Sequence, residues 1–171
     1  SGLKRARIRN RQTTTARIRD ALTHDRLSLH TQPIRSLASG GIERYEVLLR
    51  MTGDNGELLP AASFIGAAER AGMVQELDRW VVRTAIHRLA ADENTGYRLE
   101  VNLSGKSIGD PELPELIERE LAATGVDPGR LVFEITETAA IANMDHARAF
   151  AERLRKLGCR FALDVFGAGF S

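Results

Sequence analysis

The 171-residue sequence has few aromatic residues, one cysteine and no long apolar run. Because aromatic residues make up only 5%, Leu, Val, Ile and Ala must build most of the core. Cys159 alone excludes an internal disulfide framework and fits a reducing, cytoplasmic location. No apolar run approaches the ~18 residues of a membrane-spanning helix, and no signal-peptide pattern is present. With 43% hydrophobic and 27% charged residues, the composition is that of a soluble α/β domain.

The net charge of +1 hides a basic N-terminus. The first twenty residues carry seven basic side chains against Asp20 alone, so the remainder is acidic. A basic arm can bind phosphates, but no aromatic residues lie between these arginines to stack on bases, which disfavours nucleic acid as a partner. The periodic run over residues 16–27 is more typical of a charged helix. We therefore expect residues 1–21 to form a basic linker or lead-in helix.

Short strands and helices follow the basic segment. The turn at residues 36–41 predicts a hairpin between the first two strands. From residue 97 onward, strands alternate with helices, which predicts right-handed parallel crossovers. No glycine-rich phosphate loop follows an early strand, so a (β/α) barrel is favoured over a dinucleotide-binding sheet. The predicted strands are residues 27–34, 41–51, 97–103, 130–135 and 160–164, and the predicted helices are residues 61–71, 73–91, 111–124 and 143–157.

Polar residues interrupt four of these strands. Period-two geometry places Glu46 and Arg50 on one face of their strand. Asn102, Glu134 and Asp164 each lie between apolar neighbours in later strands. Taken singly, each has a structural explanation: an ion pair, a strand-end hydrogen bond or a turn residue. Together they favour a cation site, because the C-terminal ends of parallel barrel strands face the same mouth.

The ligands that these side chains offer are all oxygens. Oxygen donors suit Mg²⁺, Mn²⁺ or Ca²⁺ and disfavour structural zinc. A buried carboxylate costs several kcal/mol unless it is paired or binds a metal, which strengthens this interpretation.

Six strings in the chain resemble those of a known family. They are QPI at 32–34, EVLLR at 46–50, FI and AE at 64–65 and 68–69, VNLS at 101–104, EITE at 134–137 and LDVFGAGFS at 163–171. In order and spacing they resemble the N-terminal, five-strand portion of the EAL domain, a bacterial cyclic di-GMP phosphodiesterase family whose signature reads Glu-Ala-Leu-Leu-Arg. The resemblance covers residues 22–171.

The resemblance implies a fold, a reaction and a site. The fold is an α/β, partial (β/α) TIM-type barrel whose first strand is antiparallel and which is incomplete in this chain. The reaction is hydrolysis of cyclic di-GMP to linear pGpG with Mg²⁺ or Mn²⁺, which Ca²⁺ inhibits. The implied site comprises the metal ligands Glu46, Asn102, Glu134 and Asp164, the ligand contacts Gln32 and Arg50, and Glu137, which supports a regulatory loop that is missing here.

Two departures from the family pattern qualify this expectation. Val165 stands where the family has a second aspartate, so a carboxylate near the metals is lost and we expect impaired activity. The sequence stops at Ser171, before the family's catalytic lysine, a later glutamate and a Gln-Gly element, so this segment alone is predicted to be inactive. Its length is also below the ~250 residues of a complete barrel.

Two functions therefore stay open: a phosphodiesterase, or a degenerate EAL module that binds cyclic di-GMP or a protein without hydrolysis. Further expected partners are an upstream diguanylate-cyclase or sensory domain, and a C-terminal half or a second copy that covers the edge of the last strand.

Overall fold

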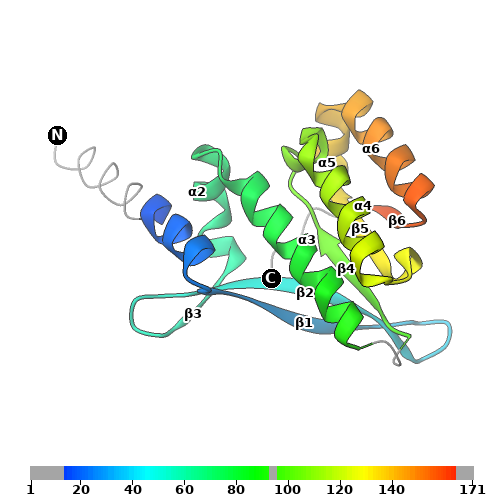
Figure 1. Cartoon of the computed structure of the whole chain (residues 1–171), viewed down its shortest axis with the longest axis horizontal. Helices are drawn as coiled ribbons and strands as arrows, with labels where there is room; N and C mark the ends of the chain where they lie inside the picture. The colour runs from blue at the N-terminus through cyan, green and yellow to red at the C-terminus, as the bar shows by residue number, and fades with distance from the viewer. Residues whose placement is uncertain (1–13, 93–95, 165–171) are drawn as a thin grey trace.

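The computed structural model describes residues 14–92 and 96–164, which form a mixed six-stranded sheet covered by helices (Figure 1). The order of the strands is β1-β2-β4-β5-β6, and β3 pairs with β2. The β1–β2 pair is antiparallel, whereas β2–β4, β4–β5 and β5–β6 are parallel. This topology confirms the predicted partial barrel with an antiparallel first strand. The strands are β1 (Leu27–Arg35), β2 (Ile42–Thr52), β3 (Leu58–Pro60), β4 (Arg98–Asn102), β5 (Leu131–Thr136) and β6 (Arg160–Asp164).

The helices connect the parallel strands and pack on one face of the sheet (Figure 1). The predicted helix over residues 61–71 is instead a 3₁₀ turn, η1 (Ala61–Ser63), followed by α2 (Ile65–Arg70). Neither β3 nor α5 was expected from the sequence. The remaining helices are α3 (Val74–Ala91), α4 (Glu112–Thr124), α5 (Glu137–Ala142) and α6 (Met144–Leu157), with 3₁₀ turns η2 (Ser107–Gly109) and η3 (Pro128–Arg130).

Alternation along the strands separates a buried face from a polar face. Val47, Leu49, Val101 and Phe133 point toward the helices and are at most 8% exposed. Burial of each such side chain contributes roughly 1.5–3 kcal/mol to folding. The other face of the same strands carries the polar residues of the sequence motifs, which are half-buried. The core therefore fixes, strand by strand, which residues face away from the helices.

A helix that includes residues 14–23 precedes β1 and packs on the domain. Ile18 and Ala21 are 0% and 1% exposed and belong to the hydrophobic core. Arg17 also pairs with Asp54 in the turn after β2, at 2.5 Å between Nη2 and Oδ2. The described part of the lead-in segment is thus attached to the sheet. Residues 1–13 lie outside the described residues, so the linker role of residues 1–21 stays a prediction.

None of the helices in the described part of the chain is long and apolar enough to cross a membrane.

Candidate functional site

The four residues predicted to bind a cation lie on the sheet face that points away from the helices. Asn102 ends β4 and pairs in register with Glu134 on β5, and Asp164 ends β6. Asn102 donates a hydrogen bond from Nδ2 to Oε1 of Glu46 at 2.9 Å. Four side chains from four adjacent strands therefore share one face, as the strand alternation predicted.

Glu134 has the most strongly perturbed carboxyl group of this face. Burial raises its pKa to about 8, and a hydrogen bond with Glu100 and the negative charges of Glu100, Asp164 and Glu46 act in the same direction. The pKa is raised because these groups add negative charge and partial burial removes solvent that would stabilise it. A cation placed among these carboxylates would be stabilised for the same reason.

Glu100 belongs to this acidic face, and the sequence interpretation missed it. It lies on β4 two residues before Asn102, and its side chain is only 13% exposed. Arg44 on β2 donates from Nη1 to Oε2 of Glu100 at 3.1 Å. The signal was available, because period two places residues 98, 100 and 102 on one face.

The chemistry of these residues fits a hard divalent cation. Carboxylate and amide oxygens are the donors that Mg²⁺, Mn²⁺ and Ca²⁺ prefer. Within residues 14–92 and 96–164, no three His, Cys, Asp or Glu side chains are arranged so that they could hold one ion together. Assignment of Glu46, Asn102, Glu134 and Asp164 as metal ligands therefore stays a prediction that rests on donor chemistry and strand position.

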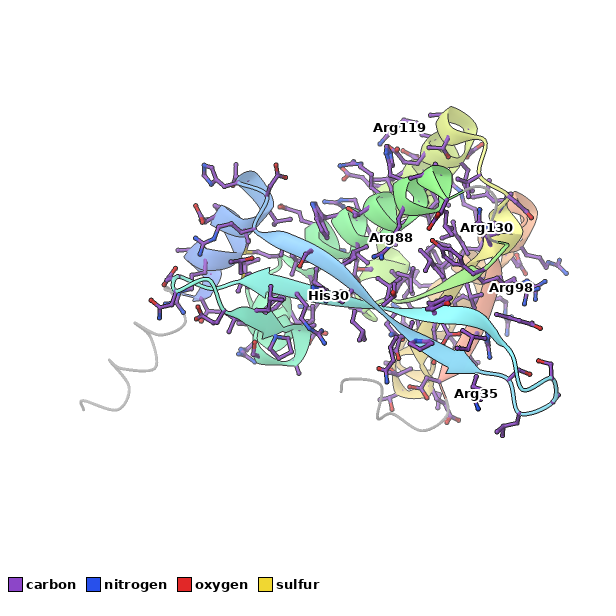
Figure 2. The ribbon with its side chains drawn as sticks, turned by 90° about the horizontal axis from the view of Figure 1, so that it is seen from below. His30, Arg35, Arg88, Arg98, Arg119 and Arg130 are labelled. Atoms are coloured by element: carbon purple, nitrogen blue, oxygen red, sulfur yellow. The ribbon has the colours of Figure 1, made fainter. Side chains whose placement is uncertain are left out.

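The two ends of this polar face carry opposite charge. The acidic residues lie toward the C-terminal ends of the parallel strands, whereas arginines line a hollow at the opposite end. Figure 2 shows Arg35 and Arg98 toward this basic end. The arginines of the hollow are Arg35, Arg44, Arg98 and Arg160.

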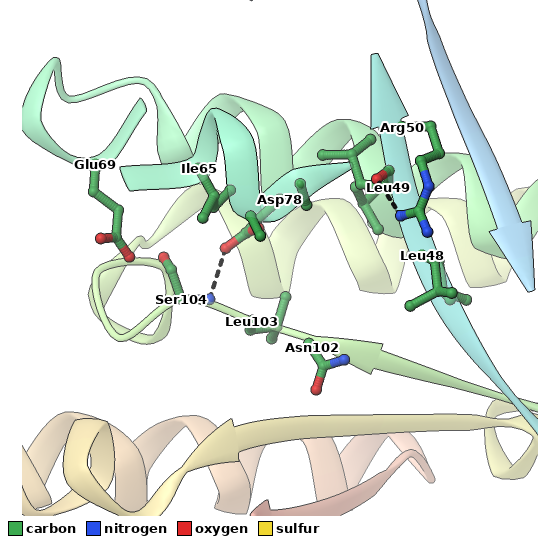
Figure 3. A pocket seen from close by; sticks show the side chains of 13 residues that line it. Leu48, Leu49, Arg50, Ile65, Glu69, Asp78, Asn102, Leu103 and Ser104 are labelled. Carbon is green, nitrogen blue, oxygen red and sulfur yellow. Dashed lines mark hydrogen bonds between the residues drawn. The ribbon is translucent and has the colours of Figure 1, made fainter. Parts of the chain in front are cut away.

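A pocket adjoins the acidic face between β2, α2, α3 and the end of β4 (Figure 3). Arg50 and Asn102 both line it, so it reaches the residues that the sequence assigned to ligand and metal. The Nη1 atom of Arg50 donates to the carbonyl oxygen of Leu49 at 3.0 Å. The remaining guanidinium nitrogens have the geometry to bind an anion such as a phosphate. The other residues of the wall are mostly apolar, including Leu48, Ile65 and Leu103.

The other predicted residues lie around this centre. Gln32 on β1 pairs in register with Glu46, which places both side chains on the same face, and it is exposed. Glu137 is the first residue of α5 and is exposed, directly after Thr136, whose side chain caps that helix. Val165 lies outside the described residues, so its effect on the site stays a prediction.

Asp78 is a second acidic residue that the sequence interpretation missed. It lies on α3 at the pocket wall and is 6% exposed. Its Oδ2 accepts hydrogen bonds from Ser104 N at 2.9 Å and Ser107 Oγ at 2.5 Å. Burial raises its pKa to about 6, although these hydrogen bonds oppose the shift. Asp78 therefore anchors the loop that follows Asn102.

Comparison with known proteins matches this architecture to one family. The family model of the EAL domain matches residues 15–171. This chain belongs to the EAL domain family. It is 39% identical over 166 residues to the cyclic di-GMP phosphodiesterase PdeB of Shewanella oneidensis, a match that covers 95% of this chain and 19% of the relative. It is 37% identical over 157 residues to the cyclic di-GMP phosphodiesterase NbdA of Pseudomonas aeruginosa, covering 90% and 20%.

A solved EAL domain has the same fold. The FimX EAL domain of Xanthomonas citri, in complex with c-diGMP, superposes with a TM-score of 0.87 at 30% identity. The match covers 96% of this chain and 65% of that chain. Our chain spans about a fifth of the length of the curated relatives that it matches.

Proposed function

We propose that this EAL domain binds cyclic di-GMP and hydrolyses one of its phosphodiester bonds to give linear pGpG, with Mg²⁺ or Mn²⁺. The observation that carries this proposal is the acidic centre of Glu46, Glu134 and Asp164 beside a pocket that contains Arg50. Two relatives named as cyclic di-GMP phosphodiesterases and a related domain in complex with c-diGMP support the choice of substrate.

Each residue has a separate part in the proposed mechanism. Glu46, Asn102, Glu134 and Asp164 would hold the cation, which lowers the pKa of water and stabilises charge on the phosphate. Asn102 orients the Glu46 carboxylate through its 2.9 Å hydrogen bond. Arg50 binds a phosphate oxygen through a charge-assisted hydrogen bond. Gln32 contacts the ligand from the neighbouring strand.

Val165 favours a second candidate, an EAL module that binds cyclic di-GMP or a protein without hydrolysis. The side chain of valine offers no oxygen to a metal ion, so the carboxylate that the family has at this position is lost. We infer that hydrolysis is slower than with aspartate at position 165. Ligand binding depends on Arg50 and the pocket and would persist. The basic residues 1–21 would connect the domain to an upstream signalling domain.

The two candidates differ in their product. Cyclic di-GMP would be incubated with Mg²⁺ or Mn²⁺ and with this sequence in its natural full chain, and pGpG would be measured by chromatography. The phosphodiesterase proposal expects slow pGpG formation, at least tenfold faster formation after Val165→Asp, and loss of formation after Glu46→Gln. Glu43→Gln, an exposed neighbour on the same strand, is the matched control and should leave the rate unchanged.

Binding with Ca²⁺ and no pGpG from either the natural sequence or Val165→Asp would identify the non-hydrolytic module. Absence of both binding and hydrolysis would refute both candidates.

A further inference from the structure

Arg44 and Glu100 form an ion pair on the polar face next to the acidic centre. Arg44 Nη1 lies 3.1 Å from Glu100 Oε2, and the pair bridges β2 and β4. The arginine side chain is 45% exposed, whereas the carboxylate is 13% exposed. Because the carboxylate is the buried partner, Arg44 supplies much of the charge compensation that Glu100 needs. The pair therefore fixes a charged side chain directly beneath the predicted cation site.

Strand β4 holds the predicted ligands of both neighbouring strands. Asn102 donates its hydrogen bond to Glu46 on β2. Glu100, two residues earlier on the same face, is hydrogen-bonded to Glu134 on β5. Since Asn102 and Glu134 are also direct partners in the sheet, Glu100 approaches Glu134 from the N-terminal side of that position. One strand thus sets the orientation of carboxylates on its two sides.

We propose that Glu100, fixed by Arg44, is a positioning residue that orients the Glu134 carboxylate for binding of a divalent cation. This inference rests on the proposed function, because it takes Glu134 as a ligand of the cation. Glu100 itself is not the ligand in this arrangement, since its Oε2 is engaged by Arg44. Groups that hold metal ligands in this way typically change metal affinity 10- to 100-fold when they are removed.

The test is a calorimetric titration of the full chain with Mn²⁺ alone, together with thermal unfolding of each variant. Glu100→Ala removes the contact with Glu134 and should weaken Mn²⁺ binding by about tenfold. Glu100→Gln keeps a side chain that donates to Glu134 and should bind within about threefold of the natural chain. Glu43→Gln, a 63% exposed carboxylate on β2, is the control for loss of one negative charge and should not change the affinity.

Arg44 offers a second variant in case Glu100→Ala unfolds. Arg44→Gln should weaken Mn²⁺ binding less than Glu100→Ala. If Arg44 acts through Glu100, then the double variant Arg44→Gln/Glu100→Ala should bind no more weakly than Glu100→Ala alone.

Each outcome decides the inference. A tenfold loss in Glu100→Ala, restored in Glu100→Gln at an unchanged unfolding temperature, supports positioning. Equal Mn²⁺ affinity in the natural chain and in Glu100→Ala or Arg44→Gln overturns positioning and leaves the proposed function intact. Equal losses in Glu100→Gln and Glu43→Gln assign the effect to net charge and also overturn it. Absence of Mn²⁺ binding by the natural chain overturns the inference together with the metal-dependent function.

Discussion

Burial of Asp78 makes the stability of this domain depend on pH in a way that one substitution should remove. The pKa of Asp78 is raised from 3.8 to about 6, mainly by burial. The folded chain therefore holds a proton on Asp78 at pH values where the unfolded chain has lost it. The resulting stability is fully present below pH 3.8 and is lost as the pH rises through about 6.

The size of the effect follows from the shift. A raise of about 2 pKa units at ~1.4 kcal/mol per unit corresponds to about 3 kcal/mol of unfolding free energy. Asp78→Asn stays neutral, and its side-chain oxygen can accept the hydrogen bonds from Ser104 and Ser107. Relative to the natural chain, this variant should therefore become about 3 kcal/mol more stable between pH 4 and pH 8, whatever its offset at pH 4.

Urea unfolding followed by the fluorescence of Trp80, the single tryptophan, measures this difference at each pH. Glu76→Gln removes an exposed carboxylate from the same helix and is the matched control, with an expected difference near zero at all pH values. Subtraction of the natural chain's curve cancels the titration of all other carboxylates. If the free-energy difference between Asp78→Asn and the natural chain is the same at pH 4 and pH 8, the raised pKa of Asp78 is refuted.

Three stability predictions test how the elements are fixed, each measured by urea unfolding at pH 7. Ile18→Ala should cost about 3 kcal/mol because this side chain is 0% exposed, and a loss below about 1 kcal/mol would mean that the lead-in helix does not pack on the domain. Gly158→Ala should cost about 1–2 kcal/mol because φ is +90° and a Cβ would meet Pro128 at 3.3 Å; an unchanged midpoint would contradict this. Thr136→Ala should cost about 1 kcal/mol through loss of the cap to Ala139 N, whereas Thr136→Ser should restore stability; equal losses would exclude capping.

Alternation and glycine signals allowed most of the fold to be predicted. Strands β1, β2, β4, β5 and β6 lie within two residues of the predicted bounds, because one buried face imposes period two on each. Strand β3 escaped prediction because three residues ending in Pro60 carry no periodic signal. Helix α5 escaped because six residues that include three alanines define no amphipathic stripe.

The site was predictable where a polar residue interrupts an apolar strand, and less so elsewhere. Asn102 and Glu134 stand out for that reason, and their shared face follows from register. Glu100 carries the same period-two signal as Asn102, but its pairing with Arg44 depends on the β2–β4 register, which a single strand does not reveal. Asp78 sits four residues after Val74 on the buried stripe of α3, a pattern that predicts burial but not its serine partners.

The most direct test of a cation-dependent cyclic di-GMP site is calorimetry of cyclic di-GMP binding, with Ca²⁺ and again with a chelator. The account predicts binding with Ca²⁺ that weakens at least tenfold in the chelator and in Glu46→Gln, while Glu43→Gln behaves like the natural chain. Equal affinity with Ca²⁺ and with the chelator, unaffected by Glu46→Gln, would contradict the claim that the acidic centre forms the site.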